Sequence, residues 1–247
     1  MTAFSIARLP ALAIVLTIFG SNAAFAQDTA LPLLGEGSIS ARSIQLFILL
    51  TVLSLAPALA IMVTCFPFIV TVLSILRSAL GLQQSPPNML IISLSIFLTY
   101  FVMDPVFTQA WQQGVTPLLA EQIEPAEAFT RVIDPFRTFM AARLDADAFK
   151  NLAALRDPTE AGAQPRDAAL SLLVPSFMLS ELERAFEIGF LVFLPFLIID
   201  LVVAAILMSM GMMMVPPAIV SLPFKLAFFV VADGWSLLSS ALVRSYF

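Results

Sequence analysis

The sequence contains no histidine and only one cysteine, Cys65. The lack of histidine excludes Ser-His and Cys-His catalysis and removes the commonest metal ligand in proteins. A single cysteine excludes an internal disulfide or a CxxC site, and the segment MVTCFPF around it is typical of a small buried residue. Because no Gly-rich phosphate loop, EF-hand or metal-ligand spacing is present either, we expect no metal, no cofactor and no enzymatic activity.

Charged residues are also scarce. They make up 12% of the chain, whereas apolar residues make up 60%, far from the roughly 25% and 45 to 50% of a soluble domain. The net charge of −5 offers no basic surface for a nucleic acid. The composition therefore predicts an all-α integral membrane protein.

The amino terminus has the pattern of a secretory signal peptide. Arg8 precedes a short apolar run over residues 9–19, and small residues end in an A-x-A site at Ala26. The run is too short to span a bilayer. We expect residues 1–26 to be removed, so that a periplasmic segment over residues 27–43 begins at Gln27; an uncleaved anchor helix is the alternative.

Residues 44–103 are predicted to form a first hydrophobic helical hairpin. Its first part, residues 44–76, is a run of 33 residues without a charge, which exceeds one straight crossing. It must tilt strongly, bend at Pro57 and Pro67, or extend beyond the hydrocarbon. A second apolar segment over residues 89–103 follows a loop that contains Gly81 and two prolines.

Residues 104–179 are predicted to form a helical insertion on the periplasmic side. The stretch 104–184 holds 12 of the 17 acidic residues, which is incompatible with a membrane span. Apolar residues recur with helical spacing between Phe129 and Met140. This apolar stripe needs a partner, which is either the rest of a packed subdomain or a neighbouring subunit.

Residues 180–247 are predicted to form a second hydrophobic hairpin. Ser180 followed by Glu183 matches a capping box, which indicates that a helix starts here, kinks at Pro195 and ends before Pro216. A fourth apolar element is expected from Lys225 to about Val243, broken at Asp233. If the signal peptide is cleaved, the loop between these two helices lies on the inner side.

Five methionines occur within seven residues at the end of the third apolar segment: Met208, Met210, Met212, Met213 and Met214. Thioether side chains are unbranched and polarizable, so they repack easily around changing shapes. In a membrane protein such a cluster could seal a passage. It could equally be ordinary core filler, and the sequence pattern leaves both interpretations open.

Charged residues inside the second hairpin are the other candidate functional residues. Placing the ionised side chains of Glu187 and Asp200 in a membrane costs free energy unless they are paired with an opposite charge or hydrated. Lys225 and Arg184 are possible partners. Glu187 and Asp200 are 13 residues apart, which places them roughly 140° apart on a straight helix, so they form no carboxylate pair. Asp233 precedes a glycine, the reverse of an intramembrane protease motif, and no second catalytic motif supports that reading.

Several segments resemble the FliP family of flagellar export proteins, which is related to the SctR subunits of injectisomes. They are SELERAFEIGF, LPFLIIDLVVA, GMMMVPP, LPFKLAFFVVADGW and, in the first hairpin, FPFIVTVLSILRSALGLQQSPPN. The resemblance implies a subunit of the export gate in the flagellar basal body of the inner membrane. Several copies, a pentamer in the family, would form a spiral channel with FliQ and FliR, next to FlhB and FlhA, and conduct unfolded flagellar proteins.

The resemblance also assigns roles to residues. Met212, Met213 and Met214 match a gasket that closes the pore, with Met208 and Met210 alongside. Glu181 is expected to support contact between subunits, and Asp200 and Lys225 to be packing or pore-polarity residues. The alternative function is an ion-coupled transporter that uses the intramembrane carboxylates; it predicts internal repeats, which the sequence lacks.

Overall fold

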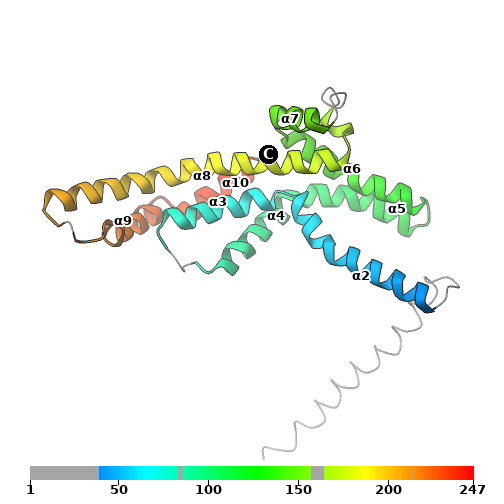
Figure 1. Cartoon of the computed structure of the whole chain (residues 1–247), viewed down its shortest axis with the longest axis horizontal. Coiled ribbons are helices and arrows are strands. Elements are labelled where there is room, and N and C mark those ends of the chain that lie inside the picture. The colour runs from blue at the N-terminus through cyan, green and yellow to red at the C-terminus, as the bar shows by residue number, and fades with distance from the viewer. Residues whose placement is uncertain (1–38, 83–85, 157–163, 213) are drawn as a thin grey trace, which may run out of the picture. The chain divides into compact units, whose positions relative to one another are not determined.

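The structure, a computed structural model, describes residues 39–82, 86–156, 164–212 and 214–247. All regular elements in these ranges are helices, as the sequence predicts (Figure 1). The predicted signal peptide and its cleavage site at Ala26 and Gln27 lie outside the described residues. The chain divides into two compact units between Ala56 and Pro57, and the description below concerns the second unit unless helix α2 is named.

The 33-residue apolar run forms two helices. Helix α2 covers Ile39–Met62 and is continuous through Pro57. Helix α3 covers Phe66–Ala79, with Pro67 in its first turn, where a missing N–H costs nothing. The chain thus breaks just before Pro67, and every residue of α2 from Ser43 onward is exposed.

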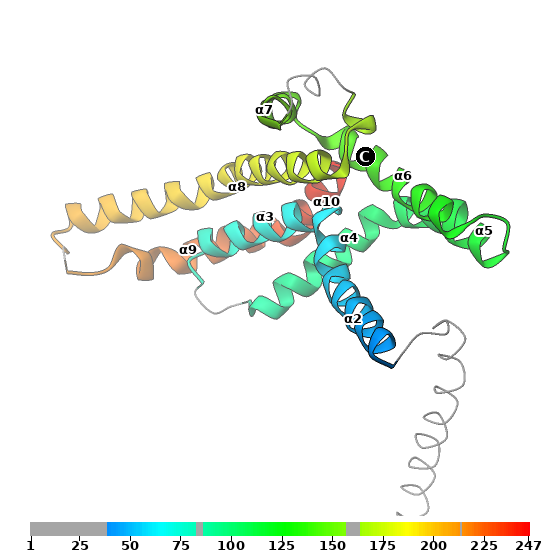
Figure 2. The same cartoon turned by 45° about the vertical axis from the view of Figure 1, so that its right-hand side comes forward.

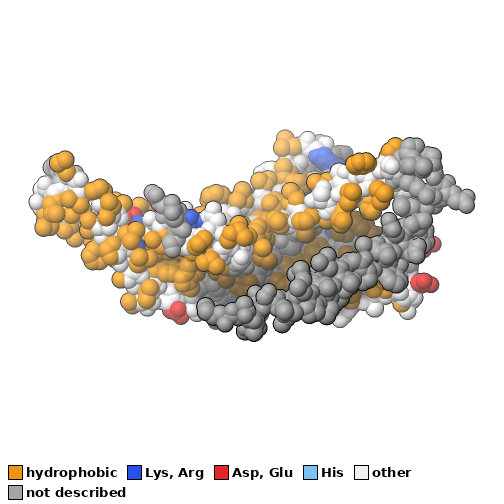
Figure 3. Space-filling view, turned by 90° about the horizontal axis from the view of Figure 1, so that it is seen from below, with side chains coloured by type: hydrophobic (Ala, Val, Ile, Leu, Met, Phe, Trp, Pro, Cys, Tyr) orange, Lys and Arg blue, Asp and Glu red, His pale blue; other side chains and the backbone are white. Residues whose placement is uncertain are grey.

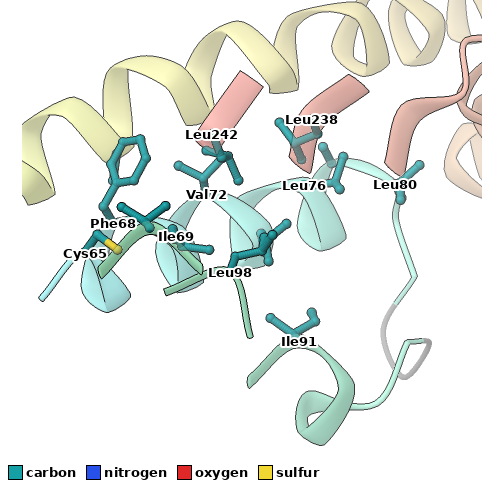
Figure 4. Close-up of a cluster of buried hydrophobic side chains, with 14 of the residues drawn as sticks. Cys65, Phe68, Ile69, Val72, Leu76, Leu80, Ile91, Leu98, Leu238 and Leu242 are labelled. Carbon is teal, nitrogen blue, oxygen red and sulfur yellow. The ribbon is translucent and has the colours of Figure 1, made fainter. Parts of the chain in front are cut away.

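Helix α3 forms the middle of the main hydrophobic core. It packs mostly against α8 and also against α4, which covers Asn88–Ala110. Figure 4 shows side chains of α3, including Val72 and Leu76, facing Leu98 of α4 and Leu242 of α10. Helices α3 and α4 therefore pack together within the predicted hairpin.

The second apolar helix is longer than predicted. Helix α4 continues past Met103, through Asp104 and Pro105, into a π-helical turn at Trp111–Val115 and then helix α5 at Thr116–Leu119. The π turn brings Gly114 against α6, where an added Cβ would lie 2.4 Å from Val132 Cγ2 and 3.0 Å from a backbone oxygen. Only a glycine permits this close approach.

Helices α6 and α7 form the middle of the predicted insertion. Helix α6 covers Pro125–Arg143 and α7 covers Ala146–Arg156, followed by a 3₁₀ turn at Pro165–Asp167. The apolar stripe of α6 packs within the same chain, because Met140 and its neighbours contact Phe177 of α8. Phe129 at the start of the stripe remains 63% exposed.

The predicted helix start at Ser180 is wrong. Helix α8 covers Leu170–Ser209 and runs through Pro175 and Pro195 without a break. Ser180 lies in its middle, where its hydroxyl donates to the Ser176 carbonyl at 2.8 Å and accepts from the Asp145 amide at 2.8 Å. The residues before Ser180 are apolar and pack on α6, so tertiary contact extends the helix beyond the apparent cap.

The last apolar element is bent. Helix α9 covers Pro217–Val231, α10 covers Gly234–Arg244, and the two meet at 62°. The break at Asp233 agrees with the prediction, since this residue has a φ of 48°, which ends α9. The element starts earlier than the predicted Lys225.

Among the described residues, three helical segments are long and apolar enough to cross a membrane: 43–62, 88–119 and 170–209. The bent pair α9 and α10 makes a fourth if it counts as one span, in agreement with the four apolar elements predicted. Apolar side chains cover much of the visible surface at the end where α8 meets α9 (Figure 3). In both cartoon views that end lies opposite α6 and α7 along α8 (Figures 1 and 2).

Candidate functional site: a methionine turn and two charged clusters

The methionine cluster forms the turn between α8 and α9. Gly211 has a φ of 73°, and its N–H and that of Met212 donate to the carbonyls of Met208 and Leu207 at 3.1 and 3.0 Å. This pairing is a Schellman motif, which satisfies the last carbonyls of α8 and reverses the chain. No atom lies within 4 Å of an added Cβ at Gly211, so within the chain the glycine serves the bend rather than a close helix approach.

The described methionines of this turn point away from the core of their own chain. Their exposed fractions are 61% for Met208, 66% for Met210, 40% for Met212 and 98% for Met214. Met213 lies outside the described residues. Core filling within this chain therefore does not account for the cluster.

An apolar groove lies next to the turn. It has a volume of 570 Å³, and α8 and α9 line it with side chains such as Val203, Leu207, Met210, Met212 and Phe224. Its described lining residues include no charged one. The turn and the groove together make a continuous apolar surface at this end of the hairpin.

Asp200 of α8 forms an ion pair with Lys225 of α9. The Lys225 ammonium donates to Asp200 Oδ2 at 2.6 Å and to the Ala79 carbonyl, the last of α3, at 3.0 Å. Ser221 donates to the other carboxylate oxygen at 2.5 Å. Since Lys225 is only 5% exposed, this pair links three helices below the surface, and a cation at a helix carboxyl end is also favoured by the helix dipole.

Glu181 lies in a second charged cluster and is fully buried. Arg143 of α6 donates through Nε to Glu181 Oε1 at 3.0 Å and through Nη1 to the Ser245 carbonyl at 2.7 Å. The Tyr246 hydroxyl donates to the second carboxylate oxygen. The Arg143 guanidinium stacks 4.0 Å from the centre of the Tyr246 ring, and the Phe68 ring meets Tyr246 edge-on.

Burial and the adjacent Glu181 carboxylate raise the pKa of Tyr246, so its phenol remains a hydrogen-bond donor. All contacts of Glu181 lie inside the chain, and the carboxylate has no exposed surface to offer a second copy. The expectation that Glu181 supports contact between subunits stays a prediction.

Glu187 and Asp233 are both exposed, and neither forms an ion pair among the described residues. The structure does not bring Glu187 together with Asp200. Sequence reasoning missed Arg143 and Tyr246, because their partner Glu181 is 38 and 65 residues away and no spacing pattern connects them.

The comparisons with known proteins agree on one family. The FliP family model matches residues 49–242. The flagellar biosynthetic protein FliP of Caulobacter vibrioides is 51% identical over 228 residues, covering 91% of this chain and 84% of the relative. The FliP proteins of Bacillus subtilis and Aquifex aeolicus are 45% and 44% identical, covering 83% and 95% of this chain and 92% and 98% of theirs.

The family match includes Glu181, the pair of Asp200 and Lys225, and the methionine turn. The chain therefore belongs to the FliP family of flagellar biosynthetic proteins, which are membrane-embedded structural components of the flagellar export gate rather than enzymes.

Proposed function

We propose that this protein is a pore-forming subunit of the flagellar export gate in the bacterial inner membrane. Several copies, five by analogy with the family, form a spiral channel with FliQ and FliR, beside FlhB and FlhA. The channel conducts unfolded flagellar proteins, and Met212, Met213 and Met214 seal it when it is closed. The insertion over residues 104–179 faces the periplasm.

The observation that carries this proposal is the exposure of the methionine turn. Four methionines expose between 40% and 98% of their surface at the tip of a helical hairpin, where a soluble monomer would bury them. Thioethers from several copies, brought together at one level, exclude water and ions by dewetting. They can also deform around an unfolded chain, because dispersion contacts are non-directional.

The length of α8 supports an assembly that extends beyond the hydrocarbon. Its 40 residues correspond to about 60 Å, twice the roughly 30 Å of a bilayer core. Apolar side chains along it, such as Phe190, Leu201 and Ile206, are more than half exposed. Neighbouring subunits and lipid together would cover them.

The test is the triple variant Met212→Ala, Met213→Ala and Met214→Ala. We expect higher ion conductance of the inner membrane because three alanines leave the constriction wider, while export and motility persist in part. Met89→Ala is the matched control, since Met89 is 70% exposed but lies on α4. Unchanged conductance in a triple variant that is inserted at the normal level contradicts the gasket.

No arrangement among the described residues favours the ion-coupled transporter. Asp200 is engaged by Lys225 and Ser221, and Glu187 lies apart from it on α8. A coupling site would need carboxylates that face one cavity.

A further inference from the structure

A pocket with acidic and apolar walls lies between the start of α7 and the first half of α8. It has a volume of 560 Å³. Its described lining residues include three acids and three large apolar side chains, and no base: Asp145, Asp147, Glu183, Leu179, Leu182 and Phe186. The pocket therefore suits a positively charged group that has apolar surface beside it.

The three acids of this pocket form no ion pair among the described residues. Of the bases nearby in the sequence, Arg143 binds Glu181, and neither Lys150 nor Arg184 lines the pocket. All three acids are also exposed, so a partner can reach them. Several like charges in one pocket favour a base that comes from outside the chain.

The apolar wall of the pocket is exposed as well. Leu179, Leu182 and Phe186 expose 49%, 41% and 57% of their surface. Glu183, Phe186 and Phe190 stand at i, i+3 and i+7, so this surface continues from the acids along one face of α8 for about 10 Å. A small cation would leave the apolar side chains uncovered, whereas a protein surface with a base next to apolar groups would cover both.

The end of α10 carries a surface of that kind. Leu237, Ala241 and Arg244 are exposed and share one face of the helix, at i, i+4 and i+7. Leu237 exposes 66% of its surface, and Arg244 forms no ion pair among the described residues. This face thus has a base and, about 10 Å along the helix, a large apolar side chain, which is the spacing of Glu183 and Phe190 on α8.

The two surfaces lie at the same level of the helical bundle. Tyr246, just after Arg244, donates to Glu181, which places the end of α10 beside the acidic part of α8. Leu237 and Ile188 line one pocket between α8 and α10, so α10 runs antiparallel to α8. In two copies that stand side by side at equal depth, the base therefore meets the acids and the leucine meets the phenylalanines.

Within one chain the two surfaces face different sides of α8. Glu181 faces the end of α10 through Tyr246, whereas the α8 side chains of the pocket lie roughly 100° to 200° around the helix from Glu181. The end of α10 thus meets a pocket of this kind only in another copy. Because the two surfaces differ, such a contact is heterologous and repeats into a ring or a spiral.

We propose that Arg244 of one copy of this chain enters the acidic pocket of the next copy, while Leu237 packs on Phe186 and Phe190. The ion pair fixes the register of the two copies, and the apolar contact excludes water around it. This inference rests on the proposed function for the presence of several copies, and it adds which surfaces meet.

Cross-linking in membranes tests which surfaces meet. Two differently tagged chains are expressed together, one with Glu183→Cys and one with Arg244→Cys. They are treated with a short bismaleimide, because the long side chains of an ion pair hold the Cα atoms too far apart for a direct disulfide. Native Cys65 is fully buried, which protects it from the reagent.

The control pair is Glu124→Cys with Arg244→Cys, since Glu124 is an exposed acid at the start of α6 and does not line the pocket. We expect about tenfold more cross-linked dimer from the Glu183→Cys pair than from the control pair, because contact raises the effective concentration of the two thiols.

Charge reversal tests the ion pair itself. Glu183→Arg and Arg244→Glu should each weaken association of the purified full-length chain about tenfold, because each variant places like charges together. The measurement is the fraction of oligomer on native gels over a dilution series. A chain that carries both changes should recover most of the association, and the control Glu124→Arg should associate like the unaltered chain.

The proposed contact is wrong if Glu183→Cys cross-links to Arg244→Cys no better than the control pair does. It is also wrong if Glu183→Cys cross-links mainly to a second Glu183→Cys chain, which indicates an isologous interface, or if the two charge reversals simply add. Any of these results in a chain that still forms an oligomer leaves the proposed function standing. A chain that stays monomeric in the membrane contradicts both.

Discussion

The ion pair between Asp200 and Lys225 allows a quantitative test of the packing of α3, α8 and α9. Replacing Lys225 by methionine keeps an unbranched side chain, one atom shorter, and removes both hydrogen bonds of the ammonium, to Asp200 and to the Ala79 carbonyl. The carboxylate then keeps only Ser221 as a donor. Removing one partner of a buried pair costs about 3 to 5 kcal/mol.

We expect the lower end of that range, about 3 kcal/mol, because the Asp200 side chain is 33% exposed and can be partly solvated. Asp200→Asn should cost a similar amount, since it leaves the Lys225 ammonium, whose side chain is only 7% exposed, without an anion. The double variant should cost about 3 kcal/mol rather than about 6, because neither charge is then left alone.

Cys65 provides the assay, because it is the only cysteine of the chain and is fully buried. Its rate of modification by a thiol reagent in detergent reports the population in which the core around α3 has opened. A loss of 3 kcal/mol corresponds to an increase in that rate of about 100-fold, at 1.4 kcal/mol per factor of ten. The stability of each variant follows from the same reaction.

Lys150→Met is the matched control, since the chain contains only these two lysines and Lys150 is exposed on α7. It should leave the rate of Cys65 modification unchanged. The reasoning is refuted if Lys225→Met behaves like this control. It is also refuted if the two single effects simply add in the double variant, because the charges would then not interact.

Four further predictions concern the other cluster and two glycines. Tyr246→Phe should lower the free energy of unfolding by about 1 to 3 kcal/mol, because Glu181 loses a hydrogen-bond donor. Glu181→Ala should lower it by about 3 to 5 kcal/mol, because Arg143 loses its ion-pair partner. Thermal unfolding measures both effects. The folded state raises the pKa of Tyr246 above the unfolded value of 10.0, so the phenol's contribution to the free energy of unfolding is complete below pH 10.0 and is lost as pH rises further. Above that pH, the free energy of unfolding should therefore fall less steeply in Tyr246→Phe. Gly114→Ala should destabilise the protein more than Gly211→Ala, because an added Cβ meets backbone atoms only at Gly114. Gly211 has a φ of 73° but open space around it, so Gly211→Ala should cost about 1 to 2 kcal/mol. Equal losses of stability in the two variants would contradict the close contact of the π turn with α6.

The sequence predicts the helical class and the number of apolar elements well, because long uncharged runs and proline or glycine breaks are local signals. The break near Pro67 and the break at Asp233 both follow from such signals. The limits of the helices are less predictable. Helix α4 continues past Asp104, which is exposed, so one acidic residue does not end a helix.

The start of α8 shows why a capping pattern can mislead. Ser180 and Glu183 have the right spacing, but the preceding turn contains Ser176 and Phe177, both fully buried in contacts that favour a continuous helix. The Ser180 hydroxyl then accepts from the Asp145 amide, near the start of α7, rather than from α8. A local pattern identifies a possible cap, whereas packing against a distant segment decides whether it is used.

The two charged clusters hold α3 at both ends. Near its start, Phe68 packs against Tyr246 in the cluster around Glu181, and at its end the Ala79 carbonyl is bound by Lys225. Glu181 and Asp200 are 19 positions apart on α8, about 28 Å, which is close to the thickness of a bilayer core. Between them α3 and α8 are joined by apolar contacts, so this part of the bundle has little freedom to rearrange.

Only about two turns of α8 extend beyond Asp200 before the methionine turn. If the methionine turn forms the proposed gasket, we expect the pore to open by movement of this short tip, while the base beneath it returns the methionines to the same level after each passage.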